Sequence, residues 1–171
     1  MTTQNAINWP AKYLPGTGDN FVSNEVVVQG VTAAQVWRHL TDTSEWEGYY
    51  DNVADISFPQ GGGPELKDDL VFSFGTFGFP PLAAHVVEFQ APAVGVPGRL
   101  SWTAKQDGPP EERLDVLHAW LVEDLDGGRV RILTQETQIG QPAAALANER
   151  PNPMLNGHQA WLDGLVSAAS K

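Results

Sequence analysis

The chain has 171 residues and no cysteine, and its 21 acidic residues against 10 basic ones give a net charge of −11. This length predicts one domain with a sizeable core, and the lack of cysteine excludes disulfides, thiol catalysis and cysteine-bound zinc. The negative charge disfavours binding to nucleic-acid phosphates or anionic lipid surfaces. With no apolar leader and no run near the roughly 20 apolar residues of a membrane span, we expect a cytoplasmic protein without membrane insertion.

The N-terminal residues 1–19 are rich in turn formers, including Pro10, Pro15 and Gly16. This composition predicts an arm that precedes a single domain at 20–171. Terminal arms stay ordered only when they are tied down, so Trp9 is expected to anchor the arm on the body.

A strand and two short helices are predicted after the arm. The stretch 21–29, FVSNEVVVQ, is rich in the β-branched residues typical of strands. Thr32 and Gln35 form the capping-box pattern that begins a helix. Thr43 or Ser44 can cap a second short helix, which leads into the aromatic stretch EWEGYYDNV at 45–53.

The rest of the chain predicts a meander followed by a long helix. Six or seven strand-like stretches with short connections fill residues 54–138, which indicates an antiparallel sheet. Asn152 and Pro153 form a strong helix start, and apolar positions then recur at intervals of four and three, which predicts an amphipathic helix of at least four turns. Gly157 and Gly164 are expected where the helix backbone closely approaches the sheet.

The order of these elements resembles the helix-grip fold of the START/Bet v 1-like (SRPBCC) superfamily, and within it the polyketide cyclase/dehydrase and lipid-transport group. The stretches that carry the resemblance are VTAAQVWRHLTDTSEWEGYYDNV, HVVEFQAP, GRLSW, HAWLVEDLDGGRVRILTQETQIG and NGHQAWLDGL. The resemblance implies an α+β fold in which a curved antiparallel sheet of six to seven strands surrounds the C-terminal helix, with the two short helices closing one end. It also implies a cavity between sheet and helix, but no shared catalytic residue.

Trp46, Tyr49 and Tyr50 lie where the fold family would have its cavity entrance. Tyrosine supplies both an apolar ring and a polar tip, as a pocket wall requires. The alternative is that these rings seal the end of the core.

Side-chain alternation places His118 and Glu136 face to face on the inner side of the sheet. Arg129 and Arg131 mark the outer face of one strand, and an odd three-residue loop at 126–128 makes the inner positions of both strands coincide. Such a pair could act as general acid and base or could orient a ligand, whereas a two-residue turn would put the residues on opposite faces. Burial alone would lower the pKa of His118, but if the cavity holds water we expect the attraction of Glu136 to raise that pKa above its ordinary value.

Two more histidines are candidates for the cavity. His158 lies on the apolar stripe of the last helix, and His85 alternates with Ala83 and Val87 on its strand. His158 could complete a metal site with His118 and Glu136, but nothing in the spacing requires one, so we expect neither metal nor cofactor. The predicted cavity residues besides His118 and Glu136 are Trp46, Tyr49, Tyr50, Phe72, Phe74, His85, Trp102, Trp120, His158, Trp161 and Leu162.

Three functions are compatible with the sequence. The first is binding or carriage of a small hydrophobic or aromatic molecule. The second is a polyketide aromatase/cyclase or dehydratase that uses His118 and Glu136. The third is a protein-interaction adaptor like the chaperone regulators of this superfamily, which a cavity too small for a ligand would favour. No nucleic-acid partner is expected, and a homodimer is left open.

Overall fold

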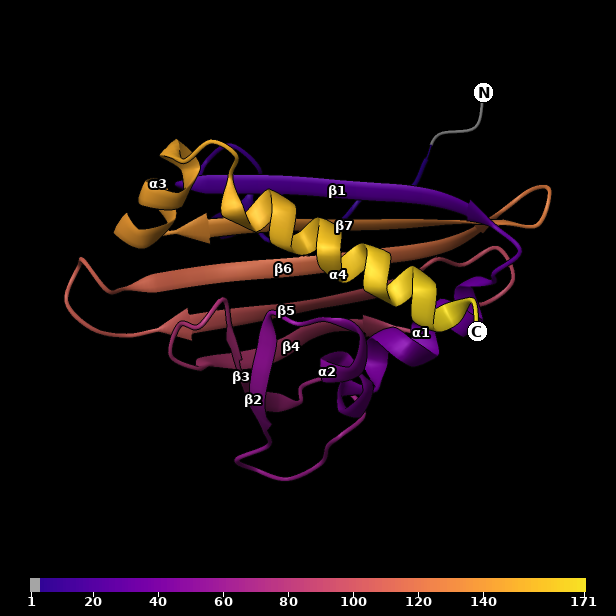
Figure 1. The fold of residues 1–171 in the computed structure, drawn as a ribbon, viewed down its shortest axis with the longest axis horizontal. Helices are drawn as coiled ribbons and strands as arrows, with labels where there is room; N and C mark the ends of the chain where they lie inside the picture. The colour runs from indigo at the N-terminus through magenta and orange to yellow at the C-terminus, as the bar shows by residue number, and fades with distance from the viewer. Residues whose placement is uncertain (1–3) are drawn as a thin grey trace.

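A computed structural model describes residues 4–171 of the chain; residues 1–3 of the predicted arm lie outside the described residues. Seven strands form one antiparallel sheet in the order β1-β7-β6-β5-β4-β3-β2 (Figure 1). Their bounds are β1 Asn20–Gln29, β2 Val53–Ser57, β3 Val71–Thr76, β4 Leu82–Gln90, β5 Gly98–Gln106, β6 Leu114–Leu125 and β7 Arg129–Ile139.

The helices fall into three groups. At one end of the sheet lie α1 (Ala33–Thr41), the 3-10 turn η2 (Thr43–Glu45) and α2 (Trp46–Tyr49), and at the other lies α3 (Gln141–Asn148). The last helix, α4 (Pro153–Ala169), runs across one face of the curved sheet (Figure 1). This is the helix-grip fold, as the order of elements predicted.

Local sequence signals explain where the helices begin. Thr32 accepts a hydrogen bond from the backbone N–H of Gln35, and the Gln35 side chain accepts one from the Thr32 backbone, so the predicted capping box is present. The Asn152 side chain accepts from the Met154 N–H at the start of α4, with Pro153 at the first helical position.

The hairpin between β6 and β7 has the predicted register. Leu125 pairs with Arg129 across the three-residue turn at 126–128, and this register puts His118 directly opposite Glu136. The even-numbered residues of β6 face α4 and the odd-numbered ones face away, as the alternation predicted.

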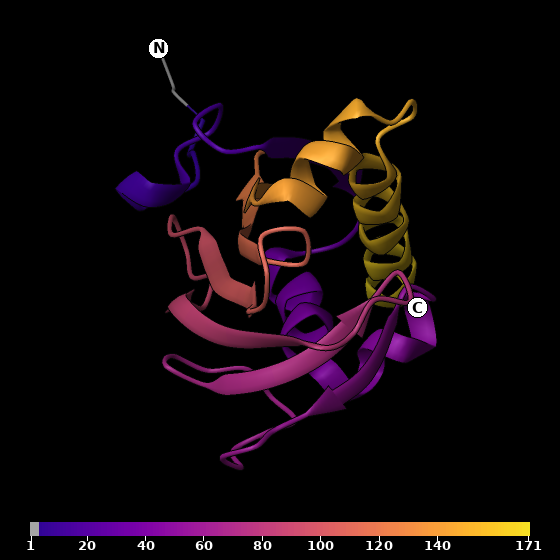
Figure 2. The ribbon, with the colours of Figure 1, turned by 90° about the vertical axis from the view of Figure 1, so that its left-hand side faces the viewer.

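The N-terminal arm covers the outer face of β6 and β7, on the side of the sheet away from α4 (Figure 2). Ile7 and Tyr13, the latter in the short turn η1 (Ala11–Tyr13), are buried against Leu117 and Leu121, and Trp9 packs beside them. Trp9 thus helps to anchor the arm, as expected, but Ile7 and Tyr13 are the more deeply buried contacts.

The arm also buries charged groups on the outer face. Arg131 donates to Glu123 at 2.9 Å, to Glu25 at 2.7 Å and to the Asn5 carbonyl at 2.9 Å. The outward-facing charges that set the register are therefore partly enclosed and paired, which offsets the cost of their burial.

The two glycines of α4 approach other elements than predicted. A Cβ on Gly164 would lie 2.0 Å from the backbone oxygen of Tyr49, and a Cβ on Gly157 would lie 2.0 Å from the Phe77 ring. The close approach is thus to α2 and to the β3–β4 turn, and the expectation that it involves the sheet was wrong.

None of the helices in the described part of the chain is both long and apolar enough to cross a membrane.

Candidate functional site

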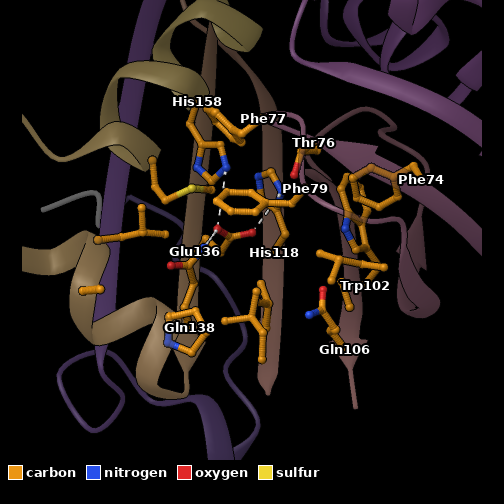
Figure 3. Close-up of a pocket in the computed structure, with 18 of the residues that line it drawn as sticks. Phe74, Thr76, Phe77, Phe79, Trp102, Gln106, His118, Glu136, Gln138 and His158 are labelled. Atoms are coloured by element: carbon orange, nitrogen blue, oxygen red, sulfur yellow. Dashed lines mark hydrogen bonds and ion pairs between the residues drawn. The ribbon is translucent and has the colours of Figure 1, made fainter. Parts of the chain in front are cut away.

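A cavity of about 380 Å³ lies between the inner face of the sheet and helices α3 and α4. Tyr50, Phe74, Trp102 and Trp161 contribute buried aromatic rings to its wall. His118 from β6, Glu136 and Gln138 from β7, and His158 from α4 contribute buried polar groups (Figure 3). An apolar wall with a few convergent polar groups is the usual composition of a ligand site, and this volume lies within the usual range of roughly 300–1,000 Å³.

The cavity reaches the surface where its lining residues are exposed. These exposed residues come from the turn after β3, the β5–β6 loop and α3, at the end of the molecule that faces the viewer in Figure 2. We call this set the mouth: Phe79, Glu111, Glu112, Ala145 and Glu149.

The predicted entrance at the opposite end is closed. Trp46 is fully buried, its Nε1 donates to the Leu40 carbonyl at 2.9 Å, and its ring contacts those of Phe72, Phe74 and Trp161. The Tyr49 hydroxyl donates to the His39 carbonyl at 2.9 Å. Tyr50 lines the cavity, but from inside, with its ring stacked 4.7 Å from that of Trp161. Of the two alternatives for Trp46, Tyr49 and Tyr50, the entrance rim was therefore wrong, and the structure has the other, in which these large rings seal the end of the core.

Other predicted cavity residues also lie elsewhere. Phe72, Trp120 and Leu162 are fully buried in the core without lining the cavity. His85 faces outward beside Asp69, with 45% of its side chain exposed, because Ala84 and Val86 take the inner positions of β4. Both faces of its strand carry apolar residues, so the alternation pattern placed His85 on the inner face by mistake. Seven predicted residues do line the cavity: Tyr50, Phe74, Trp102, His118, Glu136, His158 and Trp161.

The Glu136 carboxyl lies within 4 Å of both histidines on the cavity wall, and a dashed line joins it to each ring (Figure 3). His118 Nδ1 is 3.6 Å from one carboxyl oxygen, Oε1, and His158 Nε2 is 3.7 Å from the other, Oε2. The two imidazole rings stack with centroids 4.4 Å apart. Both distances exceed those of direct hydrogen bonds, so a water or a ligand hydroxyl can bridge the groups.

The surrounding hydrogen bonds determine which ring nitrogen of His118 carries the proton. The Thr134 hydroxyl donates its single proton to the Ala119 carbonyl at 3.2 Å, so it must accept from His118 Nε2 at 2.8 Å. Nε2 therefore carries the proton in the neutral ring, and Nδ1 presents a lone pair toward Glu136.

Glu136 is held by a chain of amide side chains that begins at the start of α4. Asn152 donates to Asn20 at 2.9 Å, Asn20 to Gln138 at 2.9 Å, and Gln138 to Glu136 Oε2 at 2.8 Å. This chain orients the carboxyl and leaves Oε1 for the proton of the neutral acid.

Burial dominates the electrostatics of this cluster. Desolvation raises the pKa of Glu136 to about 8, although the bond from Gln138 works against the shift. It lowers the pKa of His158 to about 4 and, helped by the proximity of His158, that of His118 well below its ordinary value. The pKa of His118 is thus lowered and not raised as expected for a hydrated cavity, because the ring is enclosed and desolvation outweighs attraction.

The same three residues are the candidate metal ligands among residues 4–171, with one ligand atom from each lying within 4.8 Å of the others. An imidazole nitrogen binds a metal in the plane of its ring. The rings of His118 and His158 are nearly parallel, at 18°, and stacked, so one ion cannot lie in both planes unless a ring rotates. The observed arrangement suits proton transfer or hydrogen bonding to a ligand better than metal coordination.

Several cavity residues were missed from the sequence. Gln138 continues the inner alternation of β7 and Met154 begins the apolar stripe of α4, so both could have been found. Phe77 and Phe79 could not, because they lie in an irregular turn in which Phe77 has a φ of 55°. Glu111, Glu112 and Glu149 come from loops that only the fold brings together.

Comparison with solved structures identifies a relative of high sequence identity. It is 53% identical to the hypothetical protein jhp0584 from Helicobacter pylori, over 99% of both chains and with a TM-score of 0.94. The chain belongs to the same family as this protein. No protein-family model and no curated protein matches the chain.

More distant solved structures share the fold alone. The di-domain ARO/CYC BexL from the BE-7585A biosynthetic pathway is 11% identical with a TM-score of 0.59, over 85% of this chain and 45% of BexL. Ara h 8.0201 is 10% identical with a TM-score of 0.59, over 89% of this chain and 100% of its own. These likenesses support a Bet v 1-like fold for the chain.

Proposed function

We propose that the protein binds a small apolar molecule in the cavity, with a polar group of that molecule placed against His118, Glu136 and His158. The observation that carries this proposal is the enclosed, mainly apolar cavity of about 380 Å³ with buried polar groups on its wall. Glu136 lies 3.6 Å from His118 and 3.7 Å from His158, so a ligand hydroxyl can add hydrogen bonds to this cluster and gain affinity.

The neutral fluorescent probe N-phenyl-1-naphthylamine tests this proposal. Trp102 and Trp161 line the cavity, so saturable binding is expected to quench tryptophan emission while probe fluorescence rises. Ala145→Trp places a large side chain at the mouth and should weaken binding at least ~10-fold. Ala160→Trp, on the exposed side of α4 away from the cavity, is the matched control and should bind like the wild type. Absence of saturable binding to the wild type would refute the proposal.

The acid/base cluster favours a second candidate, a cyclase- or dehydratase-like enzyme. A neutral Glu136 carboxyl can donate a proton to a ligand carbonyl oxygen, and a neutral histidine can accept one from the adjacent carbon. Distant ARO/CYC structures with this fold are compatible with such chemistry but do not favour it over binding alone. A cavity too small for a ligand would have favoured the adaptor function. The cavity of about 380 Å³ is large enough for a ligand, so no observation favours an adaptor.

Deuterium uptake by a bicyclic ketone such as 2-tetralone, followed by NMR in D₂O, distinguishes enzyme from binder. An enzyme would accelerate exchange next to the carbonyl, and Glu136→Gln would remove the acceleration while leaving ketone binding measurable. Binding of the ketone without faster deuterium exchange would rule out the enzyme and support binding or carriage only.

A further inference from the structure

The charges around the cavity bear on the class of ligand. Of the residues that line it in the described part of the chain, none is a lysine or arginine, whereas Glu111, Glu112 and Glu149 stand at the mouth. Across residues 4–171, no ion pair within 4.0 Å involves any of these three carboxylates. An anionic ligand would therefore meet uncompensated negative charge as it enters.

The nearest arginines in the sequence do not supply the missing positive charge. Arg113 donates to the Gly108 carbonyl, and Arg150 donates to the carbonyls of Ala147 and Glu149. Neither lines the cavity, so each serves the local backbone.

The interior offers aromatic faces and neutral hydrogen-bonding groups. Tyr50, Trp102 and Trp161 present ring surface, and aromatic faces attract cations and tolerate neutral groups. Gln106 and Gln138 add uncharged hydrogen-bonding groups to the same wall, and these suit a polar but uncharged part of a ligand.

We infer that the cavity selects an aromatic ligand that is uncharged or carries an amine, and that it excludes carboxylate, sulfate and phosphate ligands through Glu111, Glu112 and Glu149. This inference rests on the proposed binding function and narrows it to a ligand class. In such a complex the apolar part contacts the aromatic wall, and a cationic group stays at the mouth beside the three carboxylates, where it remains hydrated.

Three naphthalene compounds that differ only in their end group test the inference: 2-(1-naphthyl)ethanol, 2-(1-naphthyl)ethylamine and 1-naphthaleneacetic acid. Their affinities are measured by displacement of N-phenyl-1-naphthylamine at pH 7.5 in low salt. Three like charges near the entrance predict that the acid binds at least ~10-fold more weakly than the alcohol, while the amine binds as tightly as the alcohol or more so. High salt should reduce the difference.

Two triple variants locate the effect. Replacing Glu111, Glu112 and Glu149 with glutamine should bring the acid close to the alcohol in affinity. The control Glu47→Gln/Asp68→Asn/Asp126→Asn removes the same charge from exposed positions away from the cavity and should preserve the difference.

Each remaining outcome overturns a distinct claim. If the acid binds the wild type as tightly as the alcohol, the ligand-class inference fails while the binding function stands. If both triple variants reduce the difference equally, overall charge rather than the mouth is responsible, and the inference fails. If neither the probe nor the alcohol binds, the proposed function itself fails.

Discussion

The two ends of the helix-grip fold use aromatic residues in different ways. At the closed end, Trp46 and Phe72 lie in a packed cluster with every ring enclosed by others. At the mouth, Phe79 is 57% exposed and lines the same cavity as three glutamates. The same residue type thus seals one end and borders an opening at the other, which teaches that aromatic content alone does not locate an entrance. Changes at the closed end should affect stability, and changes at the mouth should affect binding.

Trp46→Ala is expected to have the largest effect on stability. Its ring contacts four other aromatic rings and is fully buried, and removing such a side chain costs about 3–5 kcal/mol. Urea unfolding followed by circular dichroism measures the loss. A cost below about 1 kcal/mol would contradict the description of this end as a packed seal.

The two glycines of α4 allow the same substitution at both ends of the molecule, Gly164 at the closed end and Gly157 near the mouth. Gly164→Ala forces a methyl group against the rigid Tyr49 backbone and should cost about 2–3 kcal/mol. Gly157→Ala meets the Phe77 ring, which can swing away, so it should cost less and should change the rate of probe entry instead. Unfolding free energies and stopped-flow probe binding test both. Equal losses of stability would show that the β3–β4 turn is as rigid as α2.

The buried carboxyl between the ends predicts a pH dependence. Burial raises the pKa of Glu136 to about 8, so the folded state holds this proton more tightly than the unfolded state. The stability that this adds to the fold is fully present below the unfolded pKa near 4.5 and is lost as pH rises toward 8. The lowered pKa values of His118 and His158 act in the opposite direction, but only below about pH 6.5. Between pH 6.5 and 8, Glu136→Gln should therefore gain stability relative to the wild type by up to about 1.4 kcal/mol per pH unit.

Urea unfolding of both proteins at several pH values measures this difference. Glu47→Gln, which removes an exposed carboxylate, is the control and should show no such trend. A constant difference between Glu136→Gln and wild type would mean that Glu136 is already ionised at pH 6.5.

Phe79→Ala should have the smallest effect on stability. The side chain is mostly exposed, so the change is expected to stay within about 0.5 kcal/mol. Its ring lines the mouth, so affinity for N-phenyl-1-naphthylamine should fall about fivefold, equivalent to about 1 kcal/mol of aromatic contact. A large stability loss with unchanged binding would show that the turn belongs to the core.

The sequence predicted the fold and the facing of His118 and Glu136 because both depend on regular periodicity. Outward Arg131 and inward alternation favour a three-residue turn over a two-residue one, and the structure has the register that this turn gives. The same reasoning failed for His85 because both faces of its strand carry apolar residues, so alternation could not tell the inner face from the outer one.

The mouth could not be predicted for a different reason. Its residues come from the β3–β4 turn, the β5–β6 loop and α3, and no sequence period connects them. The pKa of His118 was also misjudged, because the degree of enclosure depends on how Trp102, Trp120 and Trp161 pack around its ring.

The position of bound N-phenyl-1-naphthylamine, measured by intermolecular NOEs to assigned methyl groups, tests directly whether the cavity binds an apolar molecule. If the cavity binds an apolar molecule and opens at the α3 end, the probe should show NOEs to the methyls of Met154 and Leu146, which line the cavity, and none to those of Leu40 and Leu66 at the closed end. NOEs to Leu40 or Leu66 without contacts to Met154 would contradict the account.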